Sequence, residues 1–315
     1  MKKHQRGAAV ILAILIVTLA ASTAAFAMWQ QSLWTRQMEN LTDRAKADAL
    51  ALTALDWARG ILIAKDSKTG ETGADKIARN GIGTVTTPAE GTSVSGELHD
   101  MQGRFNLNNL TNGLPHHDQQ MKAFQALLDA LHLDAALAQG VADWVDGSPD
   151  NTTADLYYLG LDPAYRAAKQ KFVDVTELAR IKGFDAATVD KLAPYVAALP
   201  CIGQVANCES ALNINTATPE VLASTFGISV NDAQAVLKHA PFTSKDDIKQ
   251  YLPASVATAA AAVNYDVKSQ FFLATVKVSS GRVDAGYAAL LSTGAGATPG
   301  GANWPGIIWV KEAAN

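Results

Sequence analysis

The chain has 315 residues, of which 48% are hydrophobic and 18% are charged. This balance is that of a globular protein with a buried core, and it excludes an intrinsically disordered chain. The formal net charge of -4 provides no basic surplus to neutralise a phosphate backbone, so the composition argues against nucleic acid as the main partner.

The amino-terminal segment combines a short basic leader with a long apolar run. Basic residues and no acid precede Gly7, and no charged residue occurs between Ala8 and Arg36. Roughly 20 apolar residues suffice for a helix to cross a bilayer, so residues 8–28 are expected to span a membrane once. The basic flank places the amino end in the cytoplasm by the positive-inside rule, which puts the rest of the chain outside the inner membrane.

Three processing outcomes are open for this segment. The triplet Ala25–Ala27 would suit a secretory signal peptidase and release a periplasmic protein, but the apolar run is longer than the about 7–15 residues usual for such signals. The segment could also remain as an uncleaved anchor. The position at which the basic leader gives way to the apolar run favours a third outcome. The leader ends at Gly7, directly before the apolar run, and this resembles a class III, prepilin-type leader. Cleavage between Gly7 and Ala8 would leave the apolar helix on the mature protein.

A helical pattern continues beyond the span. Apolar residues recur there at three- and four-residue steps, as on one helical face: Trp34, Met38, Leu41, Ala45, Leu52, Leu55 and Leu62. Neither Pro nor Gly interrupts the pattern before Gly60, so one helix is expected from Ala8 to about Ala64. Such a rod suits a filament subunit, whose apolar half packs among neighbours while its amphipathic half lies on its own globular head.

Strand signals lie on both sides of a helical middle. Residues 66–96 are expected to form a loop with weak strands, and residues 96–110 to form two strands joined at Gln102–Gly103. Helical segments are expected at 121–137, 175–181, 189–199, 220–226, 231–238 and 246–252. Further strands are expected at 270–279, 287–291 and 306–310.

This order of elements predicts an α/β protein with a pilin-like fold: a long N-terminal transmembrane helix, an antiparallel sheet and a large inserted all-α domain. Residues 1–7 are expected to be the leader and residues 8–64 the helix. Residues 65–112 and 264–315 are expected to form the pilin-like domain, and residues 113–263 the inserted domain.

The two cysteines, Cys201 and Cys208, lie in a short loop that contains glycine. Because this part of the chain is expected in the oxidising periplasm, a disulfide between them is expected. The small loop that it closes corresponds to about 2–3 kcal/mol of stabilisation. The spacing does not suit a zinc site, which would need a second Cys or His pair nearby.

Four aspartates lie within residues 143–158 (DWVDGSPDNTTADLYY): Asp143, Asp146, Asp150 and Asp155. Carboxylates in an irregular loop offer hard oxygen ligands in flexible geometry, as Ca²⁺ prefers. A solvated acidic loop that caps the neighbouring helices accounts for the same residues equally well. An acid/base pair accounts for them less well, since no pocket signature accompanies them.

Residues 212–237 resemble a helix-hairpin-helix, a module that often binds the DNA backbone. Asn215–Ala217 would cap the first helix, and Phe226–Ile228 would form the hairpin. The DNA-binding form usually has a second Gly where this chain has Ser229, and the acid Asp232 lies in the flank. Phosphate binding is therefore expected to be poor, and a membrane-anchored, competence-type DNA-binding protein is an alternative function.

No catalytic apparatus is found in the sequence, and the chain is expected not to be an enzyme. His116, His117 and Asp118 are expected to form a polar helix start rather than a metal or catalytic site. The sequence contains no G-x-S-x-G elbow and no P-loop. The glycines of residues 294–300 lack the strand–turn–helix context of a dinucleotide-binding motif.

Together these features resemble the type II secretion system protein K family, the large minor pseudopilins. The matching motifs span nearly the whole chain: Gln5–Ala8 with its apolar helix, Asp100 with Gly103–Asn108, Asp143–Asp146, Asn213–Ala217 and Val267–Phe272. The resemblance implies processing by prepilin peptidase, a pilin-like head with a helical insertion, and bound calcium. It also implies a structural role at the pseudopilus tip with minor pseudopilins I and J, the major pseudopilin and the inner-membrane assembly platform.

Two positions depart from the usual patterns. Most pilin-like subunits have Glu at the fifth mature position, where this chain has Leu12. A carboxylate in a membrane helix is costly unless it is paired, and in a filament its partner is the amino terminus of the next subunit toward the tip. Because a tip subunit has no such partner, Leu12 fits that position. The acidic loop of the family usually has Glu where this chain has Ala154, which removes one expected Ca²⁺ ligand.

Overall fold

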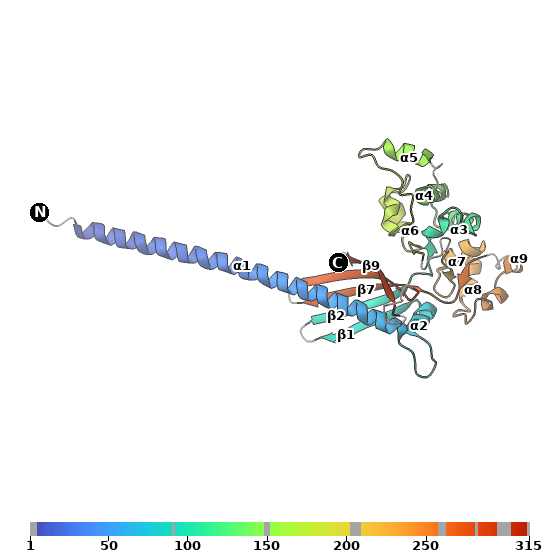
Figure 1. Ribbon diagram of the computed structural model, residues 1–315, viewed down its shortest axis with the longest axis horizontal. Coiled ribbons are helices and arrows are strands. Elements are labelled where there is room, and N and C mark those ends of the chain that lie inside the picture. The colour runs from blue at the N-terminus through green and yellow to red at the C-terminus, as the bar shows by residue number, and fades with distance from the viewer. Residues whose placement is uncertain are drawn as a thin grey trace.

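The structure is a computed structural model that describes residues 5–89, 92–147, 152–201, 209–257, 263–280, 283–294 and 304–313. One long helix carries a head made of a sheet and a helical insert, which is the segment between the second and third strands of that sheet (Figure 1). The amino terminus lies at the free end of the helix, far from the insert (Figure 1).

Helix α1 (Gln5–Ile63) is one unbroken helix of 59 residues, as predicted. Residues 9–42 are exposed, and the helix contains a stretch that is long and apolar enough to cross a membrane. Farther along, small and aliphatic side chains on one helical face are buried against the sheet: Ala47, Ala51, Ala54, Leu55, Ala58 and Leu62. Alanine at most of these positions lets the helix backbone approach the sheet closely.

Five antiparallel strands form the sheet in the order β1-β2-β7-β8-β9. Their bounds are β1 (Ile82–Ala89), β2 (Thr92–Asp100), β7 (Phe271–Ser280), β8 (Val283–Ser292) and β9 (Gly306–Ala313). Leu98 of β2 lies opposite Ala274 of β7, and both side chains are buried with Phe272 in the core beneath α1. The pairing of β2 with β7 brings the two ends of the helical insert to one edge of this core.

The insert lies beyond the end of the sheet where α1 terminates (Figure 1). Its helices are α3 (His117–Ala130), α4 (Leu137–Val145), α5 (Thr152–Leu159), α6 (Ala186–Leu192), α7 (Pro219–Phe226), α8 (Val230–Leu237) and α9 (Ala254–Ala257). Its 3-10 turns are η1 (Leu107–Leu110), η2 (Val175–Arg180) and η3 (Asp247–Gln250). Two short parallel pairs complete it, β3 (Phe105–Asn106) with β4 (Val196–Ala197) and β5 (Leu212–Asn213) with β6 (Tyr265–Asp266).

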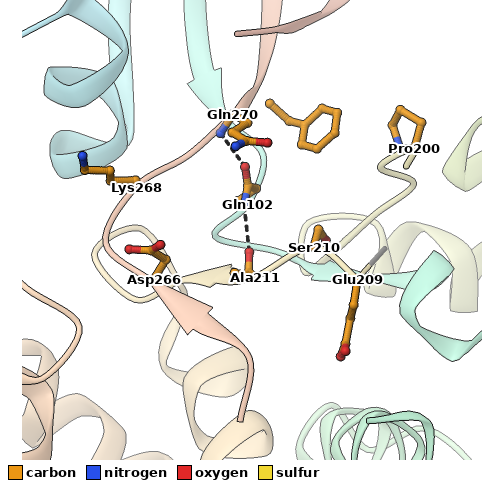
Figure 2. Close-up of a pocket in the computed structure, with 9 residues that line it drawn as sticks. Gln102, Pro200, Glu209, Ser210, Ala211, Asp266, Lys268 and Gln270 are labelled. Atoms are coloured by element: carbon orange, nitrogen blue, oxygen red, sulfur yellow. Dashed lines mark hydrogen bonds between the residues drawn. The ribbon is translucent and has the colours of Figure 1, made fainter. Parts of the chain in front are cut away.

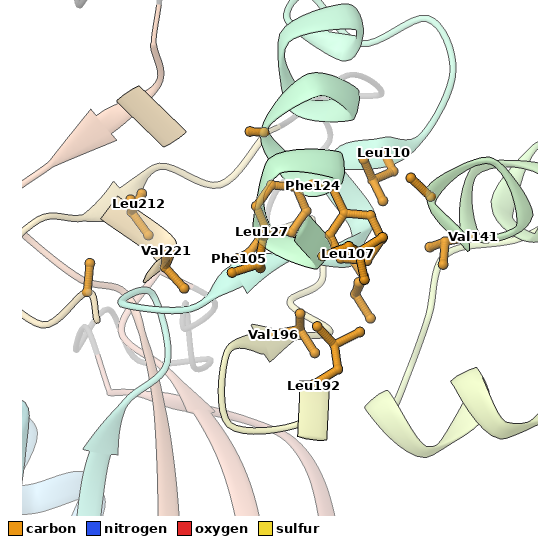
Figure 3. Packing of buried hydrophobic residues seen from close by; sticks show 14 of the residues in the cluster. Phe105, Leu107, Leu110, Phe124, Leu127, Val141, Leu192, Val196, Leu212 and Val221 are labelled. Carbon is orange, nitrogen blue, oxygen red and sulfur yellow. The ribbon is translucent and has the colours of Figure 1, made fainter. Parts of the chain in front are cut away.

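The insert has a core of its own, centred on α3. Phe124 is fully buried and stacks on Phe105, with ring centroids 5.2 Å apart. Leu107, Leu127 and Val141 of α4 belong to the same buried cluster around these rings (Figure 3). Truncating a buried Phe to Ala typically costs about 3–5 kcal/mol, so this cluster contributes a large share of the stability of the insert.

Several predicted elements differ from those observed. Helix α2 (Gly73–Asn80) and the full strand β1 occupy the stretch that was expected to be a loop with weak strands. Helix α2 begins at a capping box between Thr72 and Asp75, a signal present in the sequence. Of the two strands expected within 96–110, the second is only the two residues of β3, which pairs with β4.

The apolar periodicity of the sequence also predicted more α-helix in the insert than the structure contains. The expected helix 121–137 is divided into α3 and α4 by a turn in which His132 has a φ of 53°. The expected helices 175–181 and 246–252 are 3-10 turns. In the segment 189–199, α6 ends at Leu192 and the chain continues into β4. Segments of six to eight residues bury their apolar side chains equally well in either kind of helix, so tertiary contacts decide between them.

Candidate functional site

Motif residues from distant parts of the chain meet where the sheet joins the insert. Asp100 ends β2 and Asn213 ends β5, and both side chains are buried. Asn213 Nδ2 donates to Asp100 Oδ2 at 2.6 Å and to the carbonyl oxygen of Ala78 at 2.7 Å. Thr216 Oγ1 also donates to Asp100 Oδ2, and Ser269 Oγ lies 2.8 Å from Asn213 Nδ2. We call Asp100, Asn213, Thr216 and Ser269 the junction cluster.

Asp100 is the titratable group of the junction cluster. Burial raises the pKa of Asp100 above its ordinary value, while hydrogen bonds from Thr216, the Gln102 backbone N–H and Ser269 act in the opposite direction. Several donors therefore surround one buried carboxyl group. Loss of one partner would leave a buried polar atom unsatisfied, at a cost of about 1–3 kcal/mol, so the cluster holds the sheet and the insert in one fixed arrangement.

The turn after β2 extends this connection through Gln102 and Gly103. Gln102 Nε2 donates to the Ala211 carbonyl at 2.9 Å, and Gln102 Oε1 accepts from the Gln270 backbone N–H at 2.5 Å (Figure 2). A Cβ at Gly103 would lie 2.5 Å from the Thr216 carbonyl oxygen, so any other residue would force the turn away from the junction cluster. An open cavity of about 300 Å³ beside Gln102 is lined by a mixture of polar, charged and apolar residues, among them Lys268 and Pro200 (Figure 2).

The asparagines of the Gly103–Asn108 motif also connect distant segments of the chain by hydrogen bonds. Asn106 Oδ1 accepts from the Leu199 N–H at 3.0 Å, and Asn106 Nδ2 donates to Ser210 Oγ at 2.8 Å. Asn108 accepts from the Phe172 N–H at 2.7 Å and donates to the Phe172 carbonyl at 3.0 Å. These buried amides satisfy backbone groups of irregular segments that no helix or strand can satisfy. The motif residues are therefore scaffolding for the junction.

Gly7, Ala8 and Leu12, which were singled out for processing and assembly, lie in the first turns of α1. The side chain of Leu12 is 60% exposed on the free part of the helix. It is available to a lipid chain or to the helix of another subunit.

Three of the four predicted calcium ligands, Asp143, Asp146 and Asp155, lie in the described part of the chain. Asp143 lies on α4 and accepts from Gln139 Nε2 at 2.8 Å, and Asp146 is the C-cap of α4. Asp155, on α5, forms an ion pair of 2.8 Å with Lys169. Asp150 lies outside the described residues. Among the residues described, no group of three or more His, Cys, Asp or Glu side chains is placed to hold a metal ion.

Cys201 is disulfide-bonded. Cys208, the other cysteine of the sequence, lies outside the described residues.

Helices α7 and α8 form the two-helix unit that the sequence suggested, with Gly227 in the left-handed conformation between them (φ 66°). The N-cap of α7 is Thr218, so the expectation that Asn215–Ala217 caps this helix is wrong. Asn215 instead bonds both backbone groups of Phe242. Asp232 lies in the first turn of α8 and accepts from Ser229 Oγ at 2.7 Å. A carboxylate therefore lies at the N-terminal end of α8, where a DNA-binding helix-hairpin-helix would contact a phosphate of the DNA backbone.

His116 and His117 lie at the start of α3, with Asp118 in its first turn, as predicted. The sequence did not predict the partner of His116, the buried side chain of Glu209, whose Oε2 lies 2.7 Å from His116 Nδ1. Gln120 Nε2 donates to the other oxygen of Glu209 at 2.6 Å. This contact attaches the start of α3 to the segment after the cysteine loop.

Comparison with known proteins agrees with these features. Sequence profiles described as type II secretion system (T2SS), protein K match residues 103–201 and 212–268. Type II secretion system protein K of Pseudomonas aeruginosa is 30% identical over 297 residues, which cover 89% of this chain and 86% of the relative. The Aeromonas hydrophila protein of the same name is 28% identical over 298 residues, with 86% and 87% covered.

A solved structure has the same fold. The crystal structure of the GspK-GspI-GspJ complex from enterotoxigenic Escherichia coli contains a chain that matches with a TM-score of 0.64 and 23% identity, covering 93% of this chain and 99% of that one. A long N-terminal helix whose second half packs on an antiparallel sheet is the pilin-like fold. With the protein K relatives, this fold makes the chain a minor pseudopilin of the type II secretion system. The chain belongs to the type II secretion system protein K family.

Proposed function

We propose that this minor pseudopilin is the terminal subunit of the periplasmic pseudopilus and a non-catalytic part of the machinery that exports folded proteins across the outer membrane. The observation that carries the proposal is the position of the helical insert, beyond the end of the sheet farthest from the amino terminus (Figure 1). Pilin-like subunits stack along the helix axis, so the insert fills the space that a further subunit would need. A subunit of this shape can end a filament, but no further subunit can be added beyond it.

Minor pseudopilins I and J are the proposed partners below the tip. The solved complex of a family member with GspI and GspJ supports this assignment. The chemistry of α1 supports it as well, because large apolar side chains on the part of α1 nearest the head are exposed: Trp34, Met38, Leu41 and Leu52. Helices that bury such a stripe against one another gain about 25 cal/mol per Å² of apolar area. The major pseudopilin and the inner-membrane assembly platform would act farther down the filament.

Before assembly, the chain is proposed to sit in the inner membrane with its head in the periplasm. Prepilin peptidase would cut between Gly7 and Ala8 and leave the apolar helix attached. Leu12 supports a tip position, because an exposed leucine requires no amino terminus from a subunit above it.

Calcium binding by the acidic segment, which we define as residues 143–155, is a second part of the proposal and rests on the chemistry of its oxygen donors. The half-buried carboxylates of Asp143 and Asp146 lie at the end of α4, and Asp150 follows in sequence. Such oxygen donors suit Ca²⁺. Asp155, on α5, has a cationic partner in Lys169.

The tip assignment is tested by locating the subunit in assembled filaments. Cells that overproduce the major pseudopilin would carry this chain with a C-terminal epitope, and gold-labelled antibody would be imaged by electron microscopy. Label at one end of each filament is expected. A matched strain with the epitope on the major pseudopilin should show label along the whole length. Label of the minor pseudopilin along the length would overturn the tip assignment.

A further inference from the structure

A second cavity, of about 200 Å³, lies between the sheet and the insert, on the face of the sheet turned away from α1. Leu273 of β7, Leu290 of β8 and Trp309 of β9 are cross-strand neighbours and line it. They alternate along the strands with the side chains that pack beneath α1. Packing of α1 among the helices of other subunits therefore does not cover this cavity.

The interior of the cavity is mostly apolar and has the size of one large side chain. The insert contributes further apolar residues to its lining: Val173, Val175, Ala193, Ala198 and Leu199. An apolar cavity of about 150 Å³ is large enough to hold a benzene ring, whereas pockets for drug-sized ligands occupy about 300–1,000 Å³. The cavity therefore has room for one aromatic or large aliphatic side chain.

The charged residues that line the cavity are two cations and one anion: Arg104, Lys311 and Asp174. Lys311 Nζ lies 2.5 Å from Asp174 Oδ2, so these two charges neutralise each other. Arg104 is half-buried, its Nη1 donates to the Ala193 carbonyl at 3.3 Å, and it forms no ion pair with any residue that the structure describes. Burial lowers the pKa of the Arg104 guanidinium, and the charge of Asp100 only partly opposes this. One cation of the lining therefore has no counter-ion in contact with it in the described part of the chain.

Trp309 adds a second donor without a partner. Its indole N–H is buried and has no hydrogen-bond acceptor within the described ranges. A buried donor without an acceptor is costly, and so is a partly buried charge without a counter-ion. A carboxylate supplies two acceptor oxygens and a negative charge, which are the groups that this lining lacks.

We propose that this cavity binds a polypeptide segment in which an aromatic or large aliphatic side chain lies next to a carboxylate. The apolar side chain occupies the cavity. Arg104 binds the carboxylate, because the fork of guanidinium N–H donors matches its two oxygens. Since the cavity faces away from α1, the segment belongs to a protein that meets the filament from outside, not to a subunit stacked along α1. The site depends neither on the tip assignment nor on calcium.

The test is an NMR titration of the full-length chain in detergent, with ¹⁵N-labelled tryptophan and N-acetylphenylalanine as the probe. The chain has six tryptophans, and Trp309→Phe identifies the indole signal of Trp309. This signal is expected to shift and saturate as the probe is added. N-acetylphenylalanine amide keeps the ring without the charge and should bind about tenfold more weakly. Equal affinity for acid and amide, or no shift of the Trp309 signal at millimolar probe, would overturn the proposal.

Matched variants separate the two parts of the site. Arg104→Met is expected to weaken binding of the acid about tenfold and to leave binding of the amide unchanged. Lys277→Met removes an exposed cation on the same face of β7 as Leu273, outside the cavity, and should bind as the parent does. Ala288→Leu places a larger side chain in the cavity lining and should weaken binding of both probes.

Two results with these variants would contradict the site. A loss in Lys277→Met as large as that in Arg104→Met would show a general charge effect, and parental affinity in Ala288→Leu would show that the ring does not enter the cavity. Thermal melting of each variant shows whether it is folded. If Arg104→Met does not fold, the comparison of acid and amide on the parent chain decides the role of the carboxylate.

Discussion

Asn213 donates a hydrogen bond of 2.6 Å to Asp100 across 113 residues of sequence. Asp100 belongs to the sheet that packs on α1, and Asn213 belongs to the insert. The contact therefore connects the sheet that packs on α1 to the helical insert. Its geometry determines how the insert is held beyond the end of the sheet (Figure 1).

Asn213→Ala is expected to destabilise the protein by about 1–3 kcal/mol, since it leaves buried partners such as the Ala78 carbonyl unsatisfied. The measurement is urea unfolding of the full-length chain in detergent, followed by tryptophan fluorescence. Asn112→Ala, at an exposed position, is the matched control and should change the free energy of unfolding by less than about 0.5 kcal/mol. Equal effects of the two substitutions would contradict the role given to the junction cluster.

The raised pKa of Asp100 predicts a specific pH dependence. The folded protein holds the proton of this carboxyl more tightly than the unfolded chain, whose value is near 3.8. The contribution of Asp100 to stability is therefore greatest below pH 3.8 and is lost as the pH rises through the folded pKa. The difference in unfolding free energy between the parent and Asp100→Asn should change in this direction between about pH 4 and pH 7. A difference that is constant with pH would refute the prediction.

Leu12→Glu is expected to reduce assembly or secretion, because at the proposed tip position no subunit lies above this one to pair its amino terminus with a carboxylate in the membrane or helix bundle. The readout is the amount of a secreted substrate in the culture medium, together with the level of the subunit in membranes. Leu12→Met conserves apolar character and should behave as the parent. Normal secretion by the Leu12→Glu strain would show that the identity of this residue does not mark the tip.

Mass spectrometry of the mature protein is expected to find Ala8 as the first residue. The apolar helix would then remain attached, as a membrane-anchored filament subunit requires. Gly7→Val should leave the leader in place, because a branched side chain replaces the hydrogen of the glycine at the cut. A mature protein that begins at Met28 would instead indicate a secretory signal.

Binding to duplex DNA is expected to be undetectable at moderate salt. The first turn of α8 carries the carboxylate of Asp232, and a negative charge there repels phosphate. Fluorescence anisotropy with a labelled duplex provides the measurement, with Asp232→Ala as a variant in which this repulsion is removed. Micromolar binding by the parent that weakens in Lys238→Ala would favour the competence-type alternative.

Some of the fold could be predicted because it depends on neighbours in the sequence. The apolar run and the steps of three and four residues predicted α1, and alternating apolar residues predicted strands at the positions of β7, β8 and β9. Helices α7 and α8 were predicted nearly to their ends, because the Gly227 turn separates two short apolar patterns. Helix α2 was not predicted, although the sequence contains the residues of its capping box, Thr72 and Asp75.

The sequence by itself determined the long helix, the last three strands of the sheet, the helical middle of the chain, and the motifs that place the chain in its family. These signals are local, because the backbone repeats every 3.6 residues in a helix and every two in a strand. Only the tertiary structure decided that Asp100 meets Asn213, that Glu209 meets His116, and that Lys169 neutralises Asp155. These contacts join residues 113, 93 and 14 positions apart, the last from 169 - 155 = 14. They form only when separate elements pack, and no periodicity in the sequence encodes which polar groups then become neighbours.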